Sequence, residues 1–327
     1  MRSPLTTTGP TQKPLPLPRT GHGENLLGAG LMTLSMLAIV SNDSAMKLAI
    51  QTLPLSQAIF IRGVMVTLVL FVLVQRDGGL ALPEGRRDRW LLGFRAAAEV
   101  AATLLYLSAL QFMSIGQLSA INQAQPILIM VAAALLFRER LGVRRMAAAV
   151  VGLAGVLLIL RPGTTAFEPV ALLAVASVLA VVARDLASRG FSRAVRSSSV
   201  ALCAAASVTL SAPLTGGLSD WRLPTPPELA ALCVAAAFLT VAYLTVVSAM
   251  RIGEVGFVSP FRYTLLVFAF LLDLTVFGIW PDGWTWAGAA LVVGAGLYSI
   301  IRESRLRQDR GQGRGRGRAP RVPGMRP

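Results

Sequence analysis

Residues Tyr106–Gln117 read YLSALQFMSIGQ, and the stretch Tyr243–Glu254 reads YLTVVSAMRIGE. Five positions match without a gap at a constant offset of 137. A second similarity relates LAIVSNDSAMK (37–47) to LAVVARDLASR (179–189) at an offset of 142. A third relates AAVVGLAGVL near Gly152 to ALVVGAGLY near Gly294 at the same offset. Differences in loop length would shift the offset in this way. The chain therefore contains two copies of one unit.

The composition is that of a membrane protein. Hydrophobic residues make up 54% of the 327 positions and charged residues only 14%, whereas soluble domains have about 45–50% apolar and about 25% charged residues. A helix needs about 20 apolar residues to cross the hydrocarbon layer, and only helices or closed barrels satisfy their backbone groups there. Ten runs have this character: 26–47, 54–75, 90–111, 116–137, 143–160, 168–188, 198–217, 228–249, 255–279 and 284–301.

The basic residues orient these spans. Of the 31 Lys and Arg, 24 lie in one alternating set of loops and in the two tails, and three lie in the other set. Positive residues accumulate on the cytoplasmic side of a membrane, so both termini are expected in the cytoplasm. The net charge of +15 is thereby interpreted as an orientation signal, and no nucleic-acid partner is expected. The C-terminal RGQGRGRGR resembles RNA-binding tails but is interpreted as a solvated tail that touches anionic lipid.

The sequence gives no indication of a disulfide, a metal site or a catalytic centre. Cys203 and Cys233 lie inside apolar runs and are interpreted as packing residues rather than as a disulfide. The chain has one histidine, His22, so we expect no metal and no cofactor. The sequence contains no clustered catalytic motif, which argues against a membrane enzyme. The first apolar run is longer than the core of a cleavable signal peptide and is expected to remain as a helix.

Five spans per copy is an odd number, so the second copy must enter the membrane from the opposite side. We therefore expect an all-α membrane fold of ten transmembrane helices in two inverted repeats. The repeats are assigned to 26–160 and 168–302, between disordered tails at 1–25 and 303–327. Inverted repeats are typical of secondary transporters, whose substrate site lies near the midplane between the halves.

These features support a resemblance to a known family. Ten helices, a five-plus-five duplication and the ending FRERLG (Phe137–Gly142) resemble the drug/metabolite transporter superfamily of the EamA type. Asn42 and Asp43, followed by LPLSQAIFIRG (Leu53–Gly63), resemble a bacterial branch with uptake carriers for riboflavin and S-adenosylmethionine. The resemblance implies transport of a small organic solute without ATP, and the sequence contains no nucleotide-binding motif.

Charged residues inside the spans require partners or a water-filled cavity. Glu99 lies near the middle of span 90–111 with Arg95 one turn earlier, which fits either a structural pair or a cavity carboxylate for a cation or proton. Arg62 lies within span 54–75 and forms either a salt bridge with Asp43 or a clamp for an anion or carbonyl group.

Amides gather in the fourth span. Asn122, Gln123 and Gln125 precede Pro126, which is expected to kink the helix. They serve either as glue between helices or as hydrogen-bonding groups for a polar heterocycle or amino acid. Tyr106 and Tyr243 are candidate aromatic walls of a site, with ordinary packing as the alternative. The matched positions in the ninth span are Ser259, Pro260 and Arg262.

The duplicated acids suggest gates. Each acid precedes a base by one turn, and the repeat places the two pairs at opposite ends of the pathway. Two interhelical latches that close in alternation are one interpretation, and ordinary charges at helix ends are the other. The pairs are Asp43 with Lys47 and Asp185 with Arg189, and the expected latch partners are Arg62 and Arg184.

A carrier is the function that these features favour. A non-transporting scaffold would not need charged residues at the membrane midplane. The leading hypothesis is import of riboflavin, either coupled to protons or facilitative. The alternatives are carriers or exporters of an amino acid, S-adenosylmethionine or a metallophore.

The charge distribution predicts a topology in an inner membrane. Reporter fusions should show Gly217 outside the cell and the C-terminus in the cytoplasm, because only the alternate loops are rich in arginine. A cytoplasmic signal at Gly217 together with an external C-terminus would exclude ten spans.

Overall fold

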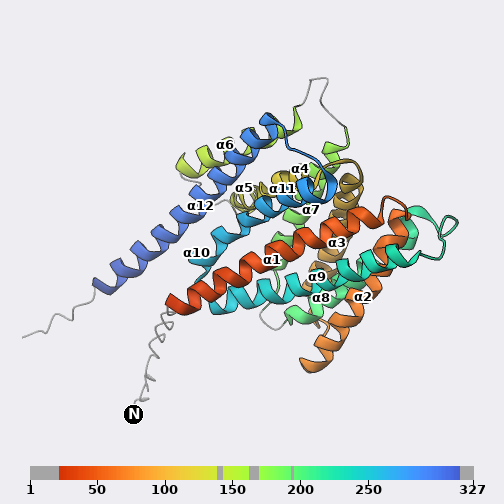
Figure 1. Ribbon diagram of the computed structural model, residues 1–327. Helices are drawn as coiled ribbons and strands as arrows, with labels where there is room; N and C mark the ends of the chain where they lie inside the picture. Colours follow the sequence, from red (N-terminus) through yellow and green to blue (C-terminus); the bar gives the residue numbers. More distant parts are fainter. Residues whose placement is uncertain (1–21, 138–142, 162–168, 193–194, 317–327) are drawn as a thin grey trace, which may run out of the picture.

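The structure is a computed structural model that describes residues 22–137, 143–161, 169–192 and 195–316, and all regular structure in these ranges is helical (Figure 1). The first repeat contains α1 (His22–Ala49), α2 (Leu55–Arg76), α3 (Arg86–Phe112), α4 (Ile115–Asn122), α5 (Gln125–Phe137) and α6 (Val143–Leu160). The second repeat contains α7 (Ala171–Arg189), α8 (Ser197–Gly216), α9 (Pro226–Ile252), α10 (Val255–Val258), the 3-10 helix η1 (Ser259–Tyr263), α11 (Thr264–Phe277) and α12 (Gly283–Arg316).

These helices match the ten predicted spans. Within the described residues, seven helical segments are long and apolar enough to cross a membrane, namely α1, α2, α3, α7, α8, α9 and the continuous stretch from η1 through α11. Of the other three predicted spans, 116–137 is divided into α4 and α5, 143–160 is α6, and 284–301 lies within α12. Helix α12 continues to Arg316, into the predicted tail. Most of the predicted FRERLG ending and most of the N-terminal tail lie outside the described residues.

Two spans are interrupted at corresponding places. The fourth span breaks between Asn122 and Gln125, one residue before Pro126, as its proline predicts. In the second repeat η1 separates α10 from α11, and Pro260 lies at its second position. Discontinuous helices at matched positions are a feature of transporter binding regions.

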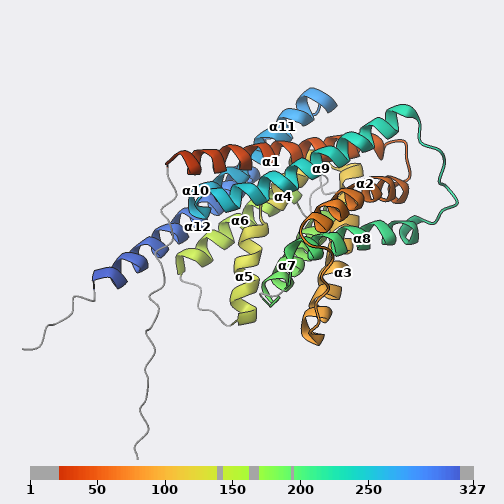
Figure 2. The same cartoon turned by 90° about the horizontal axis from the view of Figure 1, so that it is seen from below.

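Each half packs on the other with antiparallel helices. Figures 1 and 2 show α1 beside α9, α2 beside α8, α3 beside α7 and α6 beside α12. A two-fold axis exchanges the first of these pairs with the third and maps the other two onto themselves. Thr67 and Thr209, which correspond at an offset of 142, meet with their hydroxyl oxygens 3.2 Å apart. The axis of the inverted repeat therefore passes between them.

The structure corrects the register of the opening match. Helices α3 and α9 both have 27 residues, and both their first and their last residues differ by 140. Tyr106 therefore corresponds to Val246, whereas the sequence match at 137 pairs it with Tyr243. A gap-free match between two apolar helices can slip by almost one turn, because similar residues recur every three or four positions.

The α6–α12 pair is held by direct backbone contact. A Cβ atom on Gly155 would lie 2.7 Å from the carbonyl oxygen of Gly288, and one on Gly288 would lie 2.6 Å from that of Gly155. Small residues allow such close approach where lipid provides no hydrophobic drive for association.

We therefore expect Gly155→Leu to destabilise the protein. The added side chain meets the backbone of α12, and overpacking of this kind costs about 1–3 kcal/mol. Thermal unfolding in detergent should show a lower Tm, whereas Gly294→Leu, where a Cβ has no neighbour within 4 Å, serves as the control. Equal melting of both variants would contradict the assigned contact.

Candidate functional site

A pocket of about 400 Å³ lies between α2, α3, α7, α8 and α9. This volume is within the range of small-molecule sites. Most of its wall is aliphatic, including Val66, Leu70, Val208, Leu239 and Leu244. Its polar lining comprises Arg62, Arg95, Glu99, Thr103, Arg184, Thr240 and Tyr243.

The first polar group at the pocket joins α3 to α7. Arg95 and Glu99 lie one turn apart on α3, with Nη1 and Oε2 3.6 Å apart, so the predicted pair is present. The other oxygen of Glu99 accepts a hydrogen bond of 3.0 Å from Nη1 of Arg184 on α7. The carboxylate therefore bridges the two repeats. The sequence around Glu99 does not indicate this contact.

The same group extends to the broken helix. Nε of Arg184 donates to Oδ1 of the adjacent Asp185 at 2.9 Å, and the Gln125 amide donates to Oδ2 at 2.8 Å. Gln125 thus links the start of α5 to α7. Arg95 also donates to Oγ of Ser188 at 2.9 Å. We refer to Arg95, Glu99, Gln125, Arg184 and Asp185 as the α3–α7 cluster.

A second group lies between α1, α2 and α3. Nη1 of Arg62 donates to Oδ1 of Asn42 at 3.3 Å, and the Asn42 amide donates to Oδ1 of Asp43 at 2.9 Å. The Tyr106 hydroxyl donates to the other Asp43 oxygen at 2.6 Å. Asn42, Asp43 and Arg62 are all buried. The predicted association of Asp43 with Arg62 is therefore indirect, through Asn42, and Asp43 is not a charge exposed at a helix end.

Lys47 and Asp273 form a third buried group. Nζ of Lys47 donates to the Met113 carbonyl and lies 5.4 Å from the centre of the Phe277 ring. Asp273, on α11, accepts hydrogen bonds from the backbone amides of Ile115 at 3.0 Å and Gly116 at 2.6 Å. It caps the start of α4 from the other repeat. Sequence reasoning missed Asp273, although an acid inside an apolar span is a visible signal.

The remaining candidates lie away from the pocket lining. Asn122 is half-buried at the end of α4, and Gln123 donates to the Arg262 carbonyl at 3.2 Å. The Arg262 side chain is exposed in η1, and Arg189 is exposed at the end of α7. Of the predicted binding residues, the structure brings Arg62, Glu99 and Tyr243 together around the pocket.

The charged groups of the pocket present donors rather than acceptors. Both oxygens of Glu99 bind arginines, and both oxygens of Asp43 and of Asp185 accept hydrogen bonds. A guanidinium has five N–H donors, and the described hydrogen bonds use one from Arg62, one from Arg95 and two from Arg184. Nη1 of Arg95 is buried without a hydrogen bond among the described residues. The site can therefore receive carbonyl oxygens or ring nitrogens.

Known proteins resemble the chain over different lengths. Residues 26–161 match the EamA-like transporter family. A riboflavin transporter of Rhizobium johnstonii is 29% identical over 203 residues, which cover 61% of this chain and 66% of that protein. A riboflavin transporter of Vibrio cholerae is 28% identical and covers 58% of this chain and 64% of that protein. The chain thus matches just under two thirds of the length of both relatives.

Two further matches extend over more of the chain. An S-adenosylmethionine uptake transporter of Rickettsia felis is 24% identical and covers 86% of this chain and 94% of that protein. A crystal structure with 22% identity covers 87% of this chain and 98% of its own, with a TM-score of 0.57, and so shares the fold. Residues 26–161 thus resemble an EamA-like transporter domain, and the relatives and the ten-segment inverted repeat support placing the chain in the drug/metabolite transporter superfamily.

Proposed function

We propose that the protein imports riboflavin across the inner membrane by alternating access, without ATP. The observation that carries this proposal is a pocket whose lining combines guanidinium donors with many aliphatic side chains. The isoalloxazine ring of riboflavin is planar and apolar on its faces, and its edge has carbonyl oxygens and ring nitrogens. The names of the Rhizobium and Vibrio relatives support the same substrate.

The two walls of the pocket come from unequal residues at equivalent positions. Arg62 on α2 corresponds to Ala204 on α8, and Glu99 on α3 corresponds to Leu239 on α9, and all four line the pocket. The site thus straddles the two-fold axis, with charged side chains from α2, α3 and α7 and aliphatic side chains from α2, α8 and α9. Such a cavity fits a ligand with one polar edge and one apolar side.

S-adenosylmethionine is the main alternative, because its named transporters match more of the chain. This substrate carries a positive sulfonium and an ammonium group against one carboxylate, so its net charge is positive. Among the residues that the structure describes, three guanidinium groups line the pocket with a single carboxylate, Glu99, whose two oxygens already bind arginines. A cation would therefore face repulsion there, whereas neutral riboflavin would not. An amino acid or a metallophore is a further alternative.

Growth of a riboflavin auxotroph that lacks its own transporter tests this function. Expression of the protein should restore growth on micromolar riboflavin, and S-adenosylmethionine should not compete with uptake of labelled riboflavin. Proteoliposomes with and without an imposed pH gradient then separate proton-coupled from facilitated transport. No rescue despite normal expression in the membrane would exclude riboflavin.

Arg95→Gln should weaken uptake through substrate affinity. Loss of a hydrogen bond to a charged donor costs about 1.5–3 kcal/mol, which corresponds to a rise in KM of roughly 10- to 100-fold. Glu99 keeps its bond to Arg184 in this variant, so folding should survive. Arg262→Gln is the matched control, because its side chain does not line the pocket, and its KM should stay unchanged. An equal effect of both substitutions would contradict the site.

A further inference from the structure

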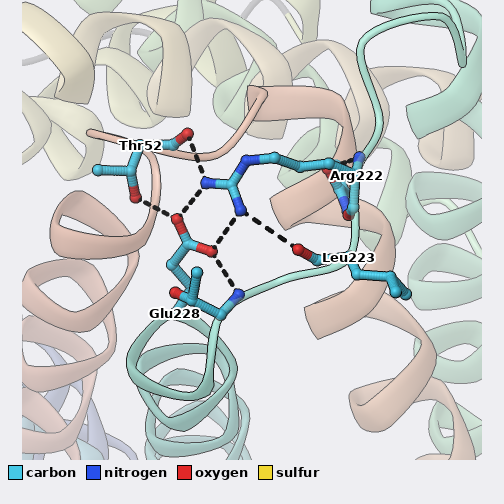
Figure 3. Close-up of polar contacts among 6 residues, drawn as sticks. Thr52, Arg222, Leu223 and Glu228 are labelled. Carbon is cyan, nitrogen blue, oxygen red and sulfur yellow. Dashed lines mark hydrogen bonds and ion pairs between the residues drawn. The ribbon is translucent and has the colours of Figure 1, made fainter.

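The loop between α8 and α9 is docked on the start of α2 (Figure 3 shows part of this region). The Trp221 indole donates to Oγ of Ser56 at 3.0 Å, and its ring centre lies 5.1 Å from that of Phe60. The backbone of Arg222 is bound on both sides by the Gln57 amide, since its N–H donates at 3.3 Å and its carbonyl accepts. The loop therefore covers this end of α2.

Glu228 is the central residue of this contact. It is the third residue of α9, and its carboxylate accepts from the Thr52 hydroxyl at 2.6 Å and from the Thr225 N–H at 2.7 Å. Both terminal nitrogens of Arg222 bind it as well, and Nη2 of Arg222 also donates to the Thr52 carbonyl at 3.2 Å. Figure 3 shows these contacts converging on one carboxylate. Glu228 thus ties α9 to the α1–α2 turn.

An equivalent contact exists at the other end of the molecule. Asp88 is the third residue of α3, and its carboxylate accepts from the Ser192 hydroxyl at 2.6 Å and from the Ser192 N–H at 3.3 Å. The α2–α3 loop is docked on α8 beside it. Nη1 of Arg196 binds the Asp77 and Gly78 carbonyls at 3.2 Å, and the Ala81 N–H donates to Oγ of Ser199 at 3.1 Å.

The two contacts are related by the repeat. Asp88 corresponds to Glu228 at the offset of 140 that relates α3 to α9, and Thr52 and Ser192 lie in the turns that follow α1 and α7, the first helices of the two repeats. Each contact joins the first turn of a long helix, α9 or α3, to the turn that follows another helix, α1 or α7. An inverted repeat places equivalent contacts at opposite faces of the membrane. We infer that Thr52–Glu228 and Ser192–Asp88 are the two gates of the carrier, each broken when its own face opens. This inference rests on the proposed alternating access.

The gates are not equally strong. Arg222 adds two charged donors to Glu228, and the position that corresponds to Arg222 at this offset is Leu82. The gate of Thr52 and Glu228 is therefore the tighter one, and the carrier rests with that face closed. The pocket fits this state, since it lies on the half of α8 nearer Ser199, at Ala201–Val208, and away from the docked loop 217–225. By the predicted topology, the tighter gate faces outward.

Two reporter cysteines can measure each gate separately. In full-length protein with Cys203 and Cys233 replaced by serine, Ala58→Cys lies one residue after Gln57, and Ala201→Cys lies two residues after Ser199. A membrane-impermeant maleimide is applied in proteoliposomes from the face of the corresponding gate. Thr52→Val should raise labelling at position 58 at least about fivefold and lower it at 201, and Ser192→Ala should do the opposite.

The controls keep the hydroxyl groups. Thr52→Ser and Ser192→Thr should label like the parent protein, and Glu228→Gln, which retains a capping side chain, should repeat the effect of Thr52→Val. Shifts in the same direction in both gate variants, or no shift in either, would overturn the inference. The labelling needs no substrate. A shift in labelling without riboflavin transport would support the gates and exclude only riboflavin as the substrate. Riboflavin transport without a shift in labelling would exclude only the gates.

Discussion

An ion inside a membrane must find its partner within the protein, and this requirement positions the pocket. Glu99 has the partners Arg95 on its own helix and Arg184 from the other repeat. Removing one member of such a pair leaves a charge inside the helix bundle with less compensation, which costs more than the pair itself contributes. The contact between α3 and α7 therefore holds the two halves in register around the pocket. The donors that remain on the arginines are the groups available to a ligand.

Much of the fold could be predicted because its signals are local. Span length depends on runs of apolar residues, and Pro126 marked the break before α5. Orientation stays a prediction from loop charge. The register between the repeats was not predictable to better than one turn, because residues such as Leu, Ala and Val recur too often in both helices. The equal lengths of α3 and α9 resolved the register between the repeats.

The site was predictable only in part. Arg95 and Glu99 are one turn apart in the sequence, so their pairing was visible, whereas Arg184 reaches Glu99 across 85 residues. The amides divided in the same way: Gln125 joined the α3–α7 cluster, and Gln123 binds backbone in η1. Thr225 and Glu228 follow the sequence pattern of a capping box, but the contact of Glu228 with Thr52 depends on the packing of α1 against α9.

Symmetry and asymmetry are distributed differently over the molecule. Contacts at the helix ends and along the axis have equivalents in both repeats, as Thr67 with Thr209 and Asp88 with Glu228 show. The pocket lining has no such equivalence, since the position that corresponds to Arg62 in the second repeat is an alanine, Ala204. A carrier that alternates between two faces needs similar energies for its two closed ends, which duplicated contacts provide. A ligand that is itself asymmetric needs unequal walls, so divergence between the repeats belongs in the pocket. Under the proposed gating, Arg222 strengthens one end only and so biases the resting state.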